Sequence, residues 1–135
     1  MKRGYAVMLL FLTMIILSGC KGKEQGEEKV RDLSFAVLCE ETIPQECRER
    51  IEEKKKDPFQ FTYADGQYLY ICVGYGRQEF GGYSISVNDL YLTGHAICVD
   101  TDLTGPAADD EKIRAETYPV VVIKTEYLDK NVVFQ

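Results

Sequence analysis

The feature that most constrains the fold of this chain is a series of short segments in which apolar residues recur at every second position. Residues 59–63 show this period, and Asp65-Gly66, a dipeptide that is favoured in tight hairpin turns, separates them from the apolar run of residues 68–75. Residues 82–92 and 96–103 repeat the arrangement around a second turn. Because a period of two places alternate side chains on one face of a strand, the pattern predicts two consecutive β-hairpins.

Four further segments complete the predicted fold. Residues 33–39 also alternate, residues 132–134 are expected to form a last short strand, and residues 120–123 form a β-branched run typical of a strand buried on both faces. Pro44 opens a short helix that residues 54–56 close with lysines. Its apolar residues recur every four positions: Ile43, Cys47 and Ile51. The sequence therefore predicts a mainly β fold: a small β-sandwich or rolled antiparallel sheet with one short amphipathic helix that covers one open end.

The N-terminus has the order of an export signal. Lys2 and Arg3 precede an apolar run that is shorter than the roughly 20 residues needed to span a bilayer, and Leu17-Ser18-Gly19-Cys20 follows. This tetrapeptide resembles the lipobox of bacterial lipoproteins, in which lipid is attached to the cysteine. We therefore expect a lipoprotein signal peptide over residues 1–19, a lipidated Cys20 and a flexible, highly charged tether up to residue 32, followed by one folded domain over residues 33–135. The expected location is the extracytoplasmic face of a bacterial membrane.

The net charge indicates which class of partner the chain can bind, and the number of cysteines indicates whether disulfides can form. The chain carries a net charge of −6, and removal of residues 1–19 makes it more acidic. An acidic domain repels phosphate groups, so the expected partner is another exported protein and not a nucleic acid. Beyond Cys20, an even number of cysteines permits disulfides in an exported chain. They are Cys39, Cys47, Cys72 and Cys98. The pairings Cys39–Cys47 and Cys72–Cys98 suit the predicted elements best, although the sequence leaves the pairing open.

Catalytic and metal-binding motifs are weak. The single histidine, His95, lies on a predicted turn, and no cysteine pair has the short spacing of a zinc or redox site. Asp100, Asp102 and Glu111 match part of the spacing of a calcium-binding loop, but they follow a predicted strand instead of a helix. We predict no enzymatic activity, no cofactor and no metal site, with calcium at these three residues as the weak alternative.

The least ordinary segment is the connection between the two hairpins, which reads Gly76-Arg77-Gln78-Glu79-Phe80-Gly81-Gly82-Tyr83-Ser84. Its pattern resembles the Gly-x-x-x-x-Gly-Gly-Tyr-Ser-like motif of the PrcB family of protease complex subunits, and the likeness extends over most of residues 33–135. The resemblance implies a non-catalytic accessory lipoprotein that helps a surface protease to mature or stay assembled. The candidate partner-binding residues in and beside the loop are Tyr75, Gly76, Arg77, Phe80, Gly81 and Gly82.

Two other functions remain open on the sequence. The same glycine-rich loop weakly resembles the wedge loop of chagasin-type cysteine-protease inhibitors, which would make the chain a protease inhibitor. A small-ligand-binding or calcium-binding lipoprotein is the other alternative. Assistance and inhibition of a protease predict opposite outcomes in an activity assay.

Overall fold

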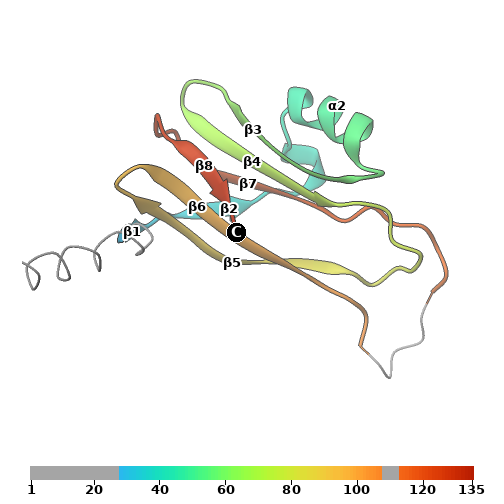
Figure 1. Cartoon of the computed structure of the whole chain (residues 1–135). Coiled ribbons are helices and arrows are strands. Elements are labelled where there is room, and N and C mark those ends of the chain that lie inside the picture. Colours follow the sequence, from blue (N-terminus) through green and yellow to red (C-terminus); the bar gives the residue numbers. More distant parts are fainter. Residues whose placement is uncertain (1–27, 108–112) are drawn as a thin grey trace, which may run out of the picture.

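The computed structural model describes residues 28–107 and 113–135, and they form two four-stranded sheets packed face to face (Figure 1). One sheet has the strand order β1-β5-β6-β8, and the other has the order β2-β7-β4-β3. The first sheet contains β1 (Lys29–Asp32), β5 (Ser84–Thr93), β6 (Ala96–Thr104) and β8 (Asn131–Phe134). The second contains β2 (Phe35–Val37), β7 (Val120–Glu126), β4 (Tyr68–Tyr75) and β3 (Pro58–Ala64). The predicted mainly β fold is confirmed, in its sandwich form.

The core between the sheets is built from alternate residues of β4 and β7, although both strands are nearly continuous apolar runs in the sequence. In β4 and β7, the residues at odd positions point inward, so that Ile71 and Ile123 are fully buried. They meet the inward-facing residues of β6, among them Ile97 and Val99. Apart from Leu33, all the fully buried members of this cluster come from the four central strands β4, β5, β6 and β7. These four strands therefore position the loops that join them.

One strand breaks the simple alternation. In β5 the inward residues are Ile85 and Val87 in the first half, but Leu90 and Leu92 in the second half. A β-bulge at Asn88 accounts for the change, because Val87 pairs with Thr101 while Asp89 pairs with the adjacent Asp100. The extra residue shifts the side-chain phase by one and keeps both halves of the strand packed on the core.

The helix covers the outer face of one sheet. After a 3-10 turn η1 (Glu40–Thr42), α2 (Gln45–Lys54) lies against β3 and β4 and buries Cys47 completely (Figure 1). This second cluster contains Tyr70, Cys72 and Val122, with Phe59 and Phe61 at its margin. The predicted helix is confirmed, but its predicted position over an open end is wrong. The outer face of β3, β4 and β7 is itself apolar and aromatic, so it must be covered.

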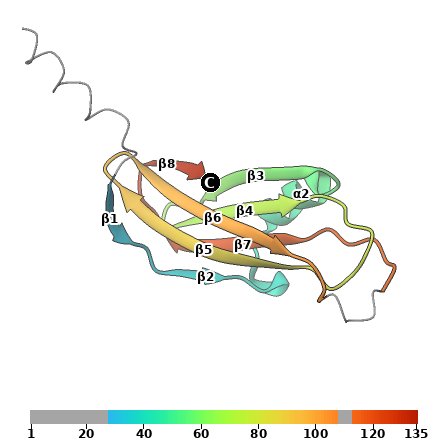
Figure 2. The same ribbon diagram turned by 60° about the horizontal axis from the view of Figure 1, so that its bottom comes forward.

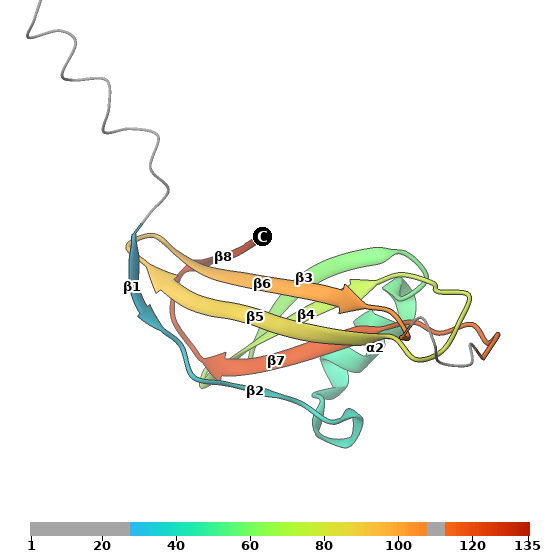
Figure 3. The ribbon, with the colours of Figure 1, turned by 90° about the horizontal axis from the view of Figure 1, so that it is seen from below.

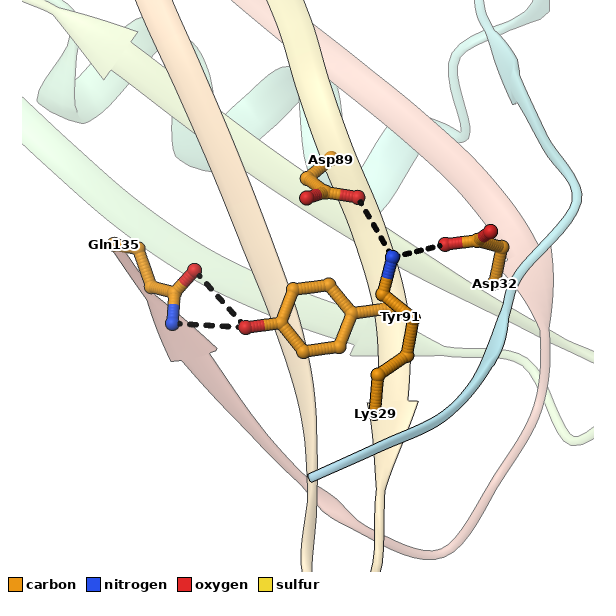
Figure 4. Close-up of polar contacts among 5 residues, drawn as sticks. All are labelled: Lys29, Asp32, Asp89, Tyr91 and Gln135. Atoms are coloured by element: carbon orange, nitrogen blue, oxygen red, sulfur yellow. Dashed lines mark hydrogen bonds and ion pairs between the residues drawn. The ribbon is translucent and has the colours of Figure 1, made fainter. Parts of the chain in front are cut away.

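The first strand differs from the predicted tether. Lys29–Asp32 was expected to belong to a flexible segment, yet it forms β1 and pairs with β5. The Lys29 ammonium contacts Asp32 at 2.9 Å and Asp89 at 3.9 Å, and it lies 5.1 Å from the centre of the Tyr91 ring (Figure 4). The hydrogen bond to Asp32 raises the pKa of Lys29. Tyr91 also bonds the side chain of Gln135, so this part of sheet β1-β5-β6-β8 holds both the first strand and the C-terminus.

Candidate functional site

The connection between β4 and β5 lies at one end of the sandwich, and the first described residues lie at the other. Lys29 pairs with Thr93 beside the β5–β6 turn, whereas β5 begins at Ser84 beside the glycine-rich loop. Two views agree that this loop and the segment that leads into β7 share the end remote from β1 (Figures 2 and 3). Since β5 spans about 30 Å at roughly 3.3 Å per residue, the two ends are well separated.

The glycine-rich loop is paired with a second segment. Gln78 and Thr117 exchange both backbone hydrogen bonds, at 2.8 and 3.0 Å, in an isolated antiparallel bridge. The Thr117 hydroxyl donates to the carbonyl of Phe80, and the amide of Gly81 donates to the carbonyl of Ile113. We call residues 76–82 together with residues 113–117 the loop arm. Backbone hydrogen bonds hold its two halves together, so the loop arm projects from the end of the sandwich with a defined conformation.

Side chains on the loop arm combine charge with apolar surface. Arg77 and Glu116 form an ion pair at 3.3 Å across the two halves. The Arg114 guanidinium lies 5.6 Å from the centre of the Phe80 ring, in the range of a cation–π contact. Ile113 leaves 70% of its surface exposed, the highest value among the exposed large apolar residues of the described chain. A shallow depression of about 240 Å³ lies among Arg77, Glu79, Arg114, Ala115 and Glu116.

The glycines of the loop have different structural roles. Gly76 and Gly82 adopt φ values of +78° and +87°, a region that other residues avoid. A Cβ on Gly82 would also lie 3.1 Å from Cβ of Pro106, and one on Gly76 would lie 2.9 Å from Cδ of Pro58. Gly81 has no such φ, and a Cβ there would meet nothing within 4 Å. The loop therefore requires glycine at positions 76 and 82 but not at position 81.

The two aromatic residues proposed as partner anchors lie differently from the sequence-based expectation. Tyr75 is the last residue of β4, packs against the core, and joins Thr101 through a 2.6 Å hydrogen bond between the two hydroxyls. Tyr75 thus links the two sheets, and its contact with a partner stays a prediction. Phe80 is half-buried beneath Arg114, so only part of its ring faces solvent.

Sequence reasoning missed the second half of the loop arm. Ile113, Arg114 and Thr117 belong to a polar stretch that carried no strand pattern. Their pairing with residues 78–81 depends on the tertiary arrangement of β4 and β7, which lie side by side. The only signal in the sequence was Ile113 itself, a large apolar residue in an otherwise polar loop.

The calcium alternative gains no support from the described residues. Asp100 and Asp102 lie on β6 and flank the side-chain amide of Asn88, which donates to Asp102 at 2.7 Å. Glu111 lies outside the described residues. Among residues 28–107 and 113–135, no three or more His, Cys, Asp or Glu side chains gather as a metal site would require.

No bond joins the described cysteines in this structure, and neither favoured pair is brought together. Cys39 is exposed, whereas Cys47 is completely buried under the helix. Cys98 alternates with the inward-facing Ile97 and Val99, so it faces outward from its sheet. Cys72 alternates in the same way with Ile71 and Val73 and faces outward from the other sheet. Both sheets, about 10 Å apart, therefore separate Cys72 from Cys98.

The remaining predicted positions fall outside the site. His95 is exposed in the β5–β6 turn, where its backbone amide donates to the Thr93 hydroxyl. Cys20 lies outside the described residues. Within the part of the chain that the structure describes, no helix has the length and apolar character needed to cross a membrane.

Comparison with known proteins identifies the central part of the chain. The family model described as PrcB C-terminal matches residues 69–126. No curated protein and no solved structure matches the chain. The matched segment contains β5, β6 and β7, nearly all of β4, and both halves of the loop arm. The match over residues 69–126 therefore supports the resemblance to the PrcB family that the sequence motif indicated.

Proposed function

We propose that this chain is a non-catalytic accessory subunit of a protease complex, anchored by lipid on Cys20 at the extracytoplasmic face of a bacterial membrane, and that it contacts its partner through the loop arm. The observation that carries the proposal is the match to the PrcB C-terminal family over a segment that includes the whole loop arm. Protease partnership follows from the family resemblance, and the location follows from the lipobox-like Leu17-Ser18-Gly19-Cys20.

The position of the loop arm suits this role. Chain that emerges from Lys29 leaves the sandwich at the end where the β5–β6 turn lies, and the loop arm projects from the other end. A lipid attached upstream of Lys29 is therefore tethered at the end remote from the loop arm. A partner can then approach the loop arm without a clash with the bilayer.

The build of the loop arm also suits protein recognition. Its backbone is already paired, so little conformational entropy is lost when a partner binds. The loop arm carries the exposed aliphatic Ile113 together with Phe80, Arg77 and Arg114, and interfaces are enriched in aromatic and Arg residues. The central contact is expected to be apolar, with the ion pair between Arg77 and Glu116 at its rim.

The first test is co-purification of the full-length chain from mildly solubilised host membranes. We expect a protease to be retained by the wild type and its recovery to fall about tenfold or more with Ile113→Asp, because a charge would be desolvated at the centre of the interface. Val133→Asp is the matched control, since Val133 is also an exposed aliphatic residue but lies on β8. Circular dichroism spectra should show that both variants are folded.

Specific results of these experiments would contradict the proposed function. It is wrong if no protease co-purifies with the wild type. The choice of the loop arm is wrong if Ile113→Asp retains the protease and Val133→Asp does not. Mass spectrometry of the N-terminal peptide checks the anchor separately, since a diacylglyceryl group on Cys20 adds a defined mass that Cys20→Ser abolishes.

Protease inhibition is separated from assistance by activity. The purified chain is added back to the recovered protease from which it has been removed. Restored or increased turnover supports an accessory subunit, whereas a stoichiometric loss of turnover supports an inhibitor. A braced loop that projects from the sandwich end is compatible with insertion into an active-site cleft, so this assay decides between the two.

A further inference from the structure

Two cysteines that the sequence did not pair meet beneath the helix. Cys47 is the only fully buried residue of α2, and Cys72 lies in the middle of β4 on the face that α2 covers. Both side chains are completely inaccessible to solvent, and the two thiols lie within hydrogen-bonding reach of each other. Tyr70 and Val122 complete the buried members of the same cluster.

We propose that Cys47 and Cys72 form a disulfide that crosslinks α2 to sheet β2-β7-β4-β3. The contact between the two buried thiols carries this pairing, and the fold removes the competitors. Cys39 is exposed, and Cys98 faces outward from the opposite sheet. The crosslink closes a loop of about 25 residues that contains most of α2, all of β3 and the β3–β4 turn.

The chemistry is thiol–disulfide exchange with a disulfide-bearing oxidant, such as oxidised glutathione or a dithiol oxidase. Cys47 and Cys72 lose two protons and two electrons as their S–S bond forms, and the disulfide of the oxidant is reduced to two thiols. An extracytoplasmic location, which belongs to the proposed function, would supply such an oxidant. The exchange itself can be tested in a redox buffer and does not depend on that location.

Burial decides when the bond can form. Removal from water raises the pKa of Cys47, and it raises that of Cys72 further, so the attacking thiolate is scarce once α2 is docked. No solvent reaches either sulfur in the folded state. The disulfide therefore forms during folding, before α2 closes over β4, and is protected from reductants afterwards.

The direct test is peptide mapping of the full chain, isolated from host membranes and also refolded in a glutathione redox buffer. Free thiols are alkylated before digestion, and the digest is not reduced. Trypsin alone leaves Cys39 and Cys47 in one peptide, because no Lys or Arg lies between Arg31 and Arg48. A second cleavage after glutamate separates them at residues 40, 41 and 46. The expected product is Cys47-Arg48 linked to the peptide that spans residues 57–77.

Variants complete the design. Cys98→Ala should keep the linked peptide, whereas Cys47→Ala and Cys72→Ala should each abolish it. Oxidised wild type should melt roughly 10 °C higher than the same protein after reduction in denaturant and refolding without oxidant. The proposal is overturned if Cys47 and Cys72 are both alkylated in the redox-buffer sample, or if either one is linked to Cys39 or Cys98. A disulfide in the redox buffer with no disulfide in the host sample would keep the pairing and contradict the proposed location.

Discussion

At the residue scale, one glycine of the described chain packs closely against an aromatic ring. Gly74 is buried in β4, and the ring of Phe59 on β3 lies directly over it. A Cβ at this position would lie 2.1 Å from Cε2 of Phe59, far inside van der Waals contact. The ring in turn packs against Phe61, with centroids 5.6 Å apart, so it has little freedom to move away. Gly74 is therefore required within the strand, because the ring of Phe59 on the paired strand occupies the space of a side chain.

This contact gives a prediction at the same scale. Gly74→Ala should lower the free energy of unfolding by roughly 1–3 kcal/mol, because the methyl group forces the Phe59 ring out of its position. Gly81→Ala is the control, and it should leave stability unchanged because a Cβ there meets nothing within 4 Å. Urea denaturation followed by fluorescence measures both. Equal midpoints for the two variants would contradict the tight packing of Gly74 against Phe59.

At the element scale, the bulge in β5 explains why odd-numbered residues point inward in the first half of the strand and even-numbered residues in the second half. Asn88 is the extra residue, and it points outward with its amide bonded to Asp102 at 2.7 Å. In a regular strand that kept Asn88, Val87 and Leu90 would lie three positions apart and could not both point inward. The alternation up to Val87 was visible in the sequence, but the change of phase was not.

Two single-residue deletions test this role. Deletion of Asn88 should turn β5 into a regular strand that still points Val87 and Leu90 inward, at a cost of about 1 kcal/mol. Deletion of Ser86 can also restore a regular strand, but it turns Val87 outward and Asn88 inward, so it should cost roughly 2–4 kcal/mol more. Denaturation midpoints of the two variants give the comparison. A larger loss for the deletion of Asn88 would show that the bulge itself stabilises the sandwich.

At the scale of the whole molecule, the N-terminal segment crosses from one sheet to the other. β1 pairs with β5, Leu33 is buried between the sheets and bonds the carbonyl of Leu90, and β2 pairs with β7. The Arg31–Glu126 ion pair, 2.9 Å long, joins the two sheets, although both side chains are about half exposed and such pairs contribute little. Backbone pairing therefore accounts for most of the contribution of β1.

This arrangement predicts a boundary that differs from the one suggested by the sequence. A chain of residues 28–135 should be more stable than a chain of residues 33–135 by roughly 1–3 kcal/mol, because the shorter chain loses the hydrogen bonds between β1 and β5. It should also associate more readily, since it exposes the edge of β5. Thermal melts and size-exclusion chromatography measure the two effects. Identical behaviour of the two chains would mean that residues 28–32 act only as a tether.

The sequence by itself determined the elements whose signals are local. Period-two alternation, the Asp65-Gly66 turn and Pro44 with its four-residue repeat identified the two hairpins and the helix, and the bounds of β4 agree with the prediction at both ends. These signals survive without tertiary context because they depend on side chains close together in the chain. The loop with Gly76 and Gly82 was likewise recognisable, because only glycine readily adopts its positive φ values.

Only the tertiary structure decided which of these parts meet. β1 carries four exposed residues and no apolar pattern, so its pairing with β5 could not be predicted. The position of α2, the inward turn of Tyr75, the partnership of residues 78–81 with residues 113–117, and the approach of Cys47 to Cys72 all depend on contacts between distant segments. Local patterns specify which face of an element is buried, but the element that buries it is chosen by the packing of the whole sandwich.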